Sequence, residues 1–183
     1  MKDDWYWWIT REMSGRGKVP PLLQPDKERE MMEVVQFEDI QTDFMNRAQQ
    51  AVYCNVATVD LKGRPRSRVM HVIWDGPIGW VITWPESHKA KHLANNPHVS
   101  LAYVNNPNKP VYVECTAKWM KEVDEMQRIW ELHKTIPPPL GFDPAPHYET
   151  IEHKYFGLLR FTPWRIELAE LGSESLIWRP SPG

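Results

Sequence analysis

Short runs of β-branched and aromatic residues, separated by turn-forming residues, recur through the middle of this 183-residue chain. Runs of this length, bounded by Gly, Pro and Asn, are typical of antiparallel strands joined by turns. Seven strands are expected, at residues 52–60, 66–74, 80–84, 99–104, 111–120, 155–161 and 165–171. Many short strands with few helices favour a closed sheet over a doubly wound one. The predicted fold class is therefore mainly β: an antiparallel β-barrel, partly open, with Greek-key-like connections.

Three segments between or before these strands have the spacing of helices. Residues 37–50 place Phe37, Ile40 and Phe44 on one face, which predicts an amphipathic helix that caps the sheet. Residues 87–96 predict a short helix with Ser87 as its N-cap and Pro97 just beyond its end. Residues 124–134 predict a third helix, followed by a Pro-rich loop over residues 137–146.

The chain divides into an N-terminal arm and one domain, at residues 1–35 and 36–183. The arm lacks a sustained period and carries the aromatic cluster at residues 5–8, which we expect to pack on the domain or on a partner subunit. The net charge of −2 provides no global field for nucleic acid or an anionic membrane, so any anion site must be a local cluster.

Cys54 and Cys115 lie within apolar, strand-like runs, and neither belongs to a CxxC motif or a Cys/His cluster. We therefore expect two free, buried thiols. The N-terminus lacks a basic segment followed by an apolar one, which predicts a cytoplasmic protein. No apolar run approaches the ~20 residues needed to cross a bilayer, so no membrane span is expected.

Three arginines alternate along the second predicted strand. Strand geometry places Arg64, Arg66 and Arg68 on one side of the sheet. His88 and Lys89 then occupy the first turn of the next helix, where cations oppose the macrodipole. A phosphate monoester would be bound well by helix amides, a hydroxyl, a lysine and arginine forks together. The alternative is that each cation belongs to the solvated surface.

In order and spacing, these segments resemble the pyridoxamine 5′-phosphate oxidase-like flavoproteins, which have an FMN-binding split barrel. The resemblance covers residues 52–171. Its motifs are Asn55-Val56-Ala57-Thr58-Val59-Asp60, Gly63-Arg64-Pro65-Arg66-Ser67-Arg68-Val69, Trp80-Val81-Ile82-Thr83, Ser87-His88-Lys89-Ala90-Lys91-His92-Leu93, Asn96-Pro97-His98-Val99-Ser100-Leu101 and Val111-Tyr112-Val113-Glu114-Cys115-Thr116-Ala117. It implies a homodimer with FMN at the subunit interface.

The resemblance also implies which residues bind the cofactor. Arg68 and Lys89 would grip the FMN phosphate, and Val69 with Met70 would lay strand backbone beside the isoalloxazine. Thr83 would stand near the polar edge of the ring. The full set of implied FMN-binding residues is Arg66, Arg68, Val69, Met70, Thr83, Ser87, His88 and Lys89. The implied activity is hydride transfer through flavin N5, to or from a small organic substrate or to oxygen; no catalytic side chain is assigned.

Several positions depart from the oxidase itself. His88 stands where the oxidase has Arg, Ile73 where it has Lys, and Ala169 where it has Trp. Nothing after Leu171 reproduces the oxidase's R-L-H-D-R stretch. These departures argue against oxidation of pyridoxamine phosphate as the activity.

Other readings of the chain stay open beside this one. The protein could be a flavin-binding or stress protein without turnover, or its barrel could hold a deazaflavin. Haem ligation by His71 or His98 is a minor alternative. His88 and His92 lie four residues apart, but no third ligand accompanies them, so no metal is expected. No nucleophile elbow, P-loop or dinucleotide fingerprint is present in the sequence.

Overall fold

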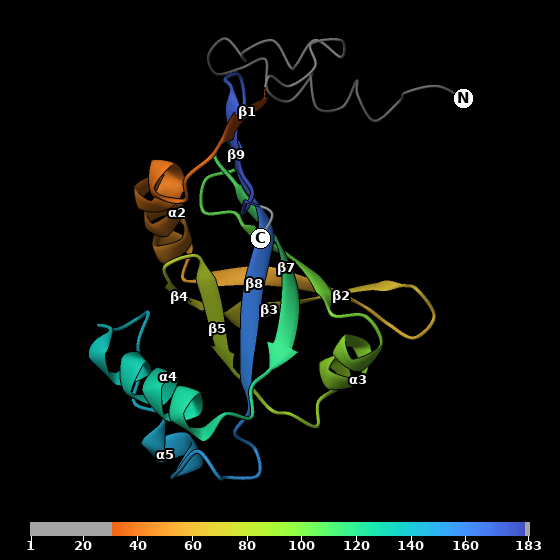
Figure 1. The fold of residues 1–183 in the computed structure, drawn as a ribbon, viewed down its shortest axis with the longest axis vertical. Helices are drawn as coiled ribbons and strands as arrows, with labels where there is room; N and C mark the ends of the chain where they lie inside the picture. Colours follow the sequence, from red (N-terminus) through yellow and green to blue (C-terminus); the bar gives the residue numbers. More distant parts are fainter. Residues whose placement is uncertain (1–30, 182–183) are drawn as a thin grey trace, which may run out of the picture. The chain divides into compact units, whose positions relative to one another are not determined.

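The computed structural model describes residues 31–181. The aromatic cluster at residues 5–8 and the rest of the predicted arm up to residue 30 lie outside the described residues. The described part is a mixed α/β fold, in which four helices accompany a large, mostly antiparallel sheet (Figure 1). The prediction of antiparallel strands with few helices is confirmed, while "mainly β" understates the helices.

The longest strands form one hydrogen-bonded path. Its order is β1 (Met31–Val34), β9 (Ser175–Trp178), β8 (Leu158–Leu168), β7 (Val111–Trp119), β6 (His98–Tyr103), β2 (Tyr53–Val59) and β3 (Pro65–His71). All neighbours are antiparallel except β1 and β9, which are parallel. β4 (Ile73–Asp75) and β5 (Ile78–Ile82) pair with each other, and β5 also pairs with β8.

A bend at Val72 closes the sheet. The predicted strand at residues 66–74 is wrong as one unit, because Val72 separates β3, which pairs with β2, from β4, which pairs with β5. A Cβ on Gly79 would come within 3.0 Å of the side chains of both Val72 and Trp74. Glycine therefore permits the close packing at the point where the sheet turns back toward β8.

The C-terminal part differs from the prediction. The two strands expected at residues 155–161 and 165–171 are one strand, β8, whose register against β7 shifts between Glu114 and Cys115. Pro163 lies opposite that shift, where its missing N–H is tolerated. Three short elements were not predicted: β1, β9, and the helix α5 (Ala145–Tyr148) within the Pro-rich loop.

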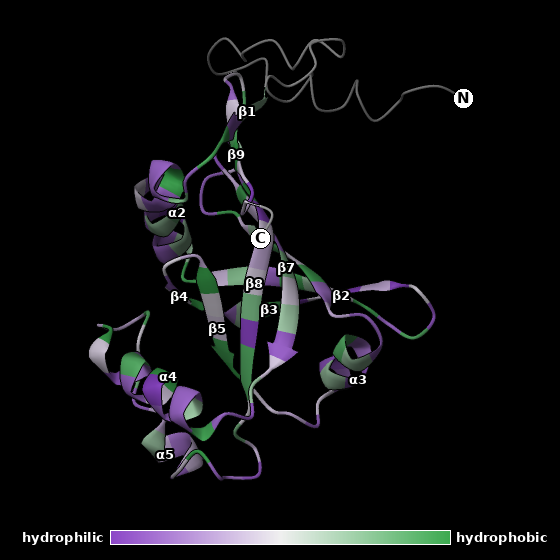
Figure 2. Ribbon diagram, in the orientation of Figure 1, coloured by the Kyte–Doolittle hydropathy of each residue, from purple (hydrophilic) through white to green (hydrophobic). Residues whose placement is uncertain are grey.

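Helix α2 (Glu38–Ala51) covers one opening of the barrel. Its buried residues Ile40, Phe44 and Ala48 join the core inside the sheet. The Phe44 and Trp74 rings meet edge to face at 4.9 Å, and Trp74 Nε1 donates to the Tyr103 hydroxyl at 2.8 Å. Figure 2 shows that α2 carries both hydrophilic and hydrophobic residues, as a covering helix requires. The predicted helix at residues 37–50 is confirmed.

Helix α4 (Val123–Thr135) forms a second core on the outer side of β5. Its Ile129 and Trp130 pack with Trp80 of β5 and with Phe156. Because strand residues alternate, Val81 belongs to the first core while Trp80 belongs to the second. The sheet is thus covered on both of its faces near β5.

Both cysteines are free and buried, as predicted. Burial raises the pKa of the Cys54 thiol to about 11, although Tyr103 and backbone contacts oppose the rise. Burial also raises the pKa of Cys115 well above its ordinary value. Thiols of this kind are protonated at neutral pH and are poor nucleophiles.

Acidification should destabilise the protein through His133. This residue is 2% exposed, its Nδ1 bonds the Ile129 carbonyl at 2.9 Å, and burial lowers its pKa. The unfolded chain therefore binds a proton that the folded chain rejects, so stability falls as the pH drops below about 6.5. We expect a slope approaching ~1.4 kcal/mol per pH unit toward pH ~5 in urea unfolding. His133→Gln should reduce this slope; an unchanged slope would contradict the assignment.

Candidate functional site

Basic side chains from β3 and from the following helix α3 (His88–Asn95) meet around one open pocket. The pocket has a volume of 380 Å³, within the range of small-molecule sites. α3 packs beside β2, and in the view of Figure 1 it lies on the other side of the sheet from α2. The residues that line the pocket are Asp60, Arg66, Ser67, Arg68, His88 and His92.

Arg68 is the most constrained of these cations. Its Nη2 donates to the Thr58 hydroxyl at 2.8 Å, whereas its Nη1 is buried and has no hydrogen-bond partner within residues 31–181. Burial lowers the pKa of the Arg68 guanidinium, and the charge of Arg66 lowers it further. A buried donor without a partner is costly, so this atom points to a ligand that completes it.

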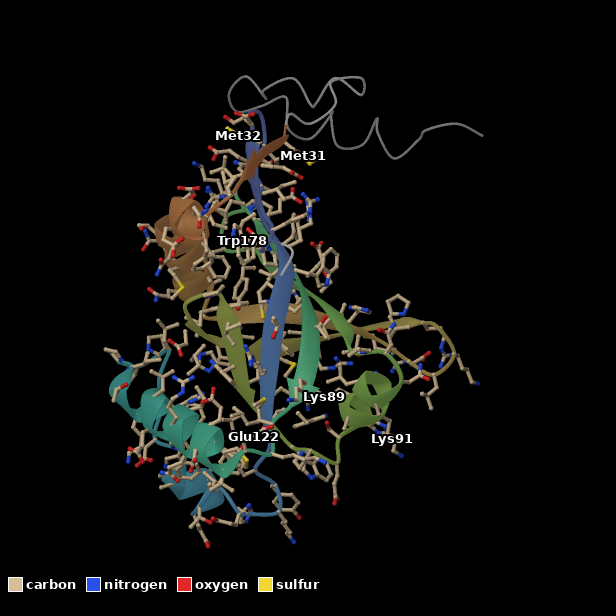
Figure 3. The ribbon with its side chains drawn as sticks, in the orientation of Figure 1. Met31, Met32, Lys89, Lys91, Glu122 and Trp178 are labelled. Atoms are coloured by element: carbon tan, nitrogen blue, oxygen red, sulfur yellow. The ribbon has the colours of Figure 1, made fainter. Side chains whose placement is uncertain are left out.

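Lys89 approaches the same place from α3. Its Nζ donates to the Ser87 hydroxyl at 2.9 Å, and Ser87 occupies the predicted N-cap position without capping the helix through its side chain. Burial lowers the pKa of Lys89, and the charge of Arg68 contributes to the same shift. Figure 3 shows Lys89 between α3 and the sheet, with Lys91 on the outer side of that helix.

Arg64 does not join this cluster. It precedes β3 and belongs to the turn, where its Nε and backbone N both donate to the Asp60 carboxylate, at 2.9 and 3.0 Å. Lys62 N donates to the same carboxylate, and these bonds hold the pKa of Asp60 well below its ordinary value. Arg64 therefore belongs to the turn before β3, and it is not among the residues that line the pocket with Arg66 and Arg68.

Four residues of the site were not in the set expected from the sequence: Thr58, Asp60, Ser67 and His92. Thr58, only 2% exposed, lies between Arg68 and His92, and its hydroxyl is 2.9 Å from His92 Nδ1. Thr58 pairs across the hairpin with Arg66, and His92 lies one turn after His88. The strand register and the helical spacing were thus the available signals, but neither identifies a shared pocket without the tertiary fold.

The remaining predicted residues are not among those that line the basic pocket. Val69 is 67% exposed on the outer face of β3, while Met70 is 9% exposed and packs into the barrel core. Thr83 follows β5, and its backbone N donates to the Gly157 carbonyl at 2.8 Å. Of the predicted set, Arg66, Arg68 and His88 share the pocket, and Lys89 with Ser87 adjoins Arg68.

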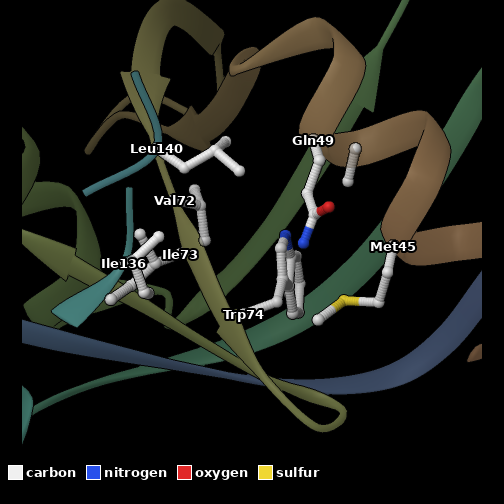
Figure 4. Close-up of a pocket in the computed structure, with 8 residues that line it drawn as sticks. Met45, Gln49, Val72, Ile73, Trp74, Ile136 and Leu140 are labelled. Carbon is white, nitrogen blue, oxygen red and sulfur yellow. The ribbon is translucent and has the colours of Figure 1, made fainter. Parts of the chain in front are cut away.

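A second cavity, between α2 and β4, is much smaller. Figure 4 shows Met45 and Gln49 of α2 facing Trp74, with Ile136 and Leu140 closing the other side. Its volume is 30 Å³, which is room for about one water molecule. A cofactor of flavin size cannot occupy it.

Within residues 31–181, no group of three or more His, Cys, Asp or Glu side chains is placed to hold a metal ion. The same part of the chain contains no helix long and apolar enough to cross a membrane. The pocket is lined by guanidinium and imidazole groups together with the Asp60 carboxylate, and the ammonium of Lys89 adjoins Arg68. This excess of basic groups favours the binding of an anion.

Arg68 should contribute nothing to stability when no anion is bound. Arg68→Met removes a desolvated charge that has an unpartnered nitrogen and basic neighbours, so we expect stability in phosphate-free buffer to stay within ~1 kcal/mol or to rise. The matched control is Arg47→Met, because Arg47 pairs with Asp43 at 2.6 Å and with the Ala169 carbonyl at 2.9 Å. The control should lose ~1–3 kcal/mol. If Arg68→Met and Arg47→Met lose equal free energy of unfolding in urea, Arg68 stabilises the fold and the prediction is wrong.

One known protein is similar to this chain in sequence over part of its length. The chain is 36% identical to General stress protein 26 of Bacillus subtilis (strain 168) over 80 residues, which are 42% of this chain and 56% of that protein. The match thus spans about half of the stress protein's length.

Two solved structures show the same fold at low sequence identity. One is a pyridoxamine 5′-phosphate oxidase-related, FMN binding protein from Nostoc punctiforme PCC 73102, with a TM-score of 0.54 and 17% identity; the match covers 76% of this chain and 87% of that one. The other is described as an F420 reductase, with a TM-score of 0.51 and 18% identity, covering 67% and 94%.

The family comparison covers more than half of the chain. Residues 41–143 match the model of the pyridoxamine 5′-phosphate oxidase family. This range contains the whole basic pocket, from Thr58 on β2 to His92 on α3. The protein is therefore a member of the pyridoxamine 5′-phosphate oxidase family.

Proposed function

We propose that this protein is an FMN-dependent oxidoreductase with an FMN-binding split barrel, and that it exchanges a hydride with a small organic substrate or with oxygen. The observation that carries the proposal is the buried, unpartnered Nη1 of Arg68 beside Lys89. Asp60, the acidic side chain in the lining of this pocket, is already paired with Arg64 at 2.8 Å, so within residues 31–181 no free carboxylate balances Arg68 and Lys89. A phosphate dianion supplies that missing charge.

The residues present fit the phosphate end of FMN. Arg68 and Lys89 would bind the phosphate oxygens directly. Arg66, which lies on β3 with Arg68, would assist them. Ser87 and the first amides of α3 would add neutral donors at a helix N-terminus, which favours anions. His88 lines the same pocket in the place of the oxidase's arginine.

The flavin ring would lie along the part of β3 that follows Arg68. In this arrangement the backbone of Val69 and Met70 flanks the ring, and Thr83 stands near its polar edge. When bound, FMN supplies hydride exchange at N5. The protein positions the ring and tunes it with hydrogen bonds, while this chain offers no side chain to which we assign a catalytic role.

We further propose that the FMN lies between two copies of the chain. β3 is the last strand of the sheet path, and within residues 31–181 it pairs with β2 alone. The outer face of this hairpin presents Tyr53 and Val69, which are 59% and 67% exposed. Exposed apolar side chains beside a cofactor site suit a subunit interface.

Oxidation of pyridoxamine phosphate is not part of the proposal. Ile73, in the place of the oxidase's lysine, is 3% exposed and packs in the second core. Ala169, in the place of its tryptophan, is also 3% exposed. Neither side chain offers the polar contact that a substrate phosphate or pyridine ring would need.

Removing the two central cations should release FMN while leaving the fold intact. Charge-assisted bonds contribute ~1.5–3 kcal/mol each, so Arg68→Ala with Lys89→Ala should weaken FMN binding ~10²–10⁴-fold in a fluorescence titration. Binding of riboflavin, which lacks the phosphate, should change little. Lys118→Ala is the control, because the Lys118 side chain is 67% exposed and its ion pair within residues 31–181 is with Glu122. Undiminished FMN affinity in the double variant would refute the proposed anchor.

The dimer makes a separate prediction. Val69→Asp places a charge on the outer face of β3, so the mass measured by light scattering should fall from two chains to one. FMN affinity should fall with it. Val123→Asp is the control, since Val123 is 62% exposed at the start of α4, away from the hairpin. A wild-type protein that is monomeric with bound FMN would exclude this arrangement.

Two comparisons favour specific second candidates. The similarity to a stress protein favours a flavin-binding role without turnover, and the similarity to an F420 reductase favours a deazaflavin in the same pocket. Anaerobic reduction of the bound FMN by a reduced nicotinamide would support turnover. A protein that stays oxidised under those conditions favours the first candidate, and one that takes up a deazaflavin but not FMN favours the second.

A further inference from the structure

Thr58 joins the main phosphate anchor to a histidine that has no assigned role. Its hydroxyl lies 2.8 Å from Arg68 Nη2 and 2.9 Å from His92 Nδ1. All three side chains come from different elements: Thr58 from β2, Arg68 from β3 and His92 from α3. His92 lines the pocket beside Arg66 and Arg68, and Thr58 joins two of these lining residues to each other.

The direction of each hydrogen bond follows from donor chemistry. A guanidinium can only donate, so the Thr58 oxygen accepts from Arg68. Within residues 31–181, the one remaining partner for the Thr58 hydroxyl proton is His92 Nδ1, since Thr58 is 2% exposed. If Nδ1 carried a proton, that hydroxyl proton would be buried without an acceptor. The arrangement that satisfies every group has Nδ1 unprotonated and the ring proton on Nε2.

We propose that His92 is a further ligand of the bound phosphate, and that Thr58 fixes the imidazole as the Nε2–H tautomer so that it donates into the pocket. This inference rests on the proposed function, because it names an additional residue of the same site. Nδ1 is engaged at Thr58, and no described hydrogen bond involves Nε2. A single hydroxyl thereby orients two donors, Arg68 Nη1 and His92 Nε2, toward one anion.

The surroundings of His92 favour its neutral form. The charged or titratable groups that face it are Arg66 and Arg68 on β3, His88 on its own helix and Asp60 at the end of β2. Burial lowers the pKa of His92, and Arg68, Arg66 and His88 lower it further, while Asp60 opposes them. A neutral donor needs no proton uptake, so FMN affinity should be level between pH 7 and pH 8. If His92 had to be protonated to bind the phosphate, FMN affinity would fall between pH 7 and pH 8.

The tautomer can be measured before any ligand is added. In the full-length protein labelled with ¹⁵N-histidine, the His92 Nδ1 resonance should have the shift of an unprotonated nitrogen at pH 7.5. Thr58→Val removes the hydroxyl at nearly constant volume and should yield a mixture of tautomers, whereas Thr58→Ser should restore one. A protonated Nδ1 in the wild-type protein would overturn the proposal, whether or not the protein binds FMN.

Two substitutions at position 92 test the ligand role. His92→Asn keeps an acceptor at the place of Nδ1 but removes the donor at Nε2, while His92→Gln keeps a donor with that reach. We expect FMN to bind about ten-fold more weakly or worse to the Asn variant, with the Gln variant closer to wild type. Riboflavin affinity should be equal in all three. Wild-type FMN affinity in the Asn variant would overturn the ligand role.

Inorganic phosphate separates a failure of this inference from a failure of the proposed function. If the wild-type protein binds no flavin, the FMN assignment is wrong. Phosphate should still move the His92 Nε2 resonance in the wild-type protein and leave it unmoved in Arg68→Met. A His92 Nε2 resonance that ignores phosphate, with FMN bound normally, would exclude His92 as a ligand while leaving the FMN assignment intact.

Discussion

Closure of the sheet at Val72 is the constraint on which the rest of the structure depends. β3 and β4 are nearly continuous, yet one pairs with β2 and the other with β5, and β5 then pairs with β8. This bend satisfies the backbone groups of β4 and β5 and encloses the first core. It also leaves the β2–β3 hairpin projecting from the barrel, where α3 can pack against β2 and complete the basic pocket.

Like charges lie close together at the pocket, and their repulsion lowers the stability of the fold. Arg66, Arg68 and Lys89 repel one another, and burial weakens the solvation of the last two. Arg165, by contrast, is paired with Glu114 and Glu167 at 3.0 and 2.6 Å. A cluster of partly buried cations that repel one another is the pattern expected where a fold gives up stability for ligand binding.

The sequence analysis predicted elements correctly where they depend on residues nearby in the chain, and it failed where they depend on residues far apart. The helix at residues 37–50 and the strand at 52–60 appear as α2 and β2 within a residue or so, because their hydrophobic spacing is local. The prediction failed at Pro163, which divides the sequence pattern of β8 but not the strand, since the shifted register tolerates the missing N–H. It also failed at Val72, because the strand-like run at residues 66–74 gives no sign that the pairing partner changes there.

The sequence by itself determined most of the strands, the turns, the covering helices and the presence of basic residues on a strand and at a helix start. Each of these depends on neighbours a few residues away. Only the tertiary structure decided where the strands change partners, that Arg68 keeps one nitrogen unpaired, and that Thr58 joins Arg68 to His92. The Thr58–His92 contact spans 34 residues. Contacts of that range exist only after the sheet has closed, because closure sets which side chains share one buried space.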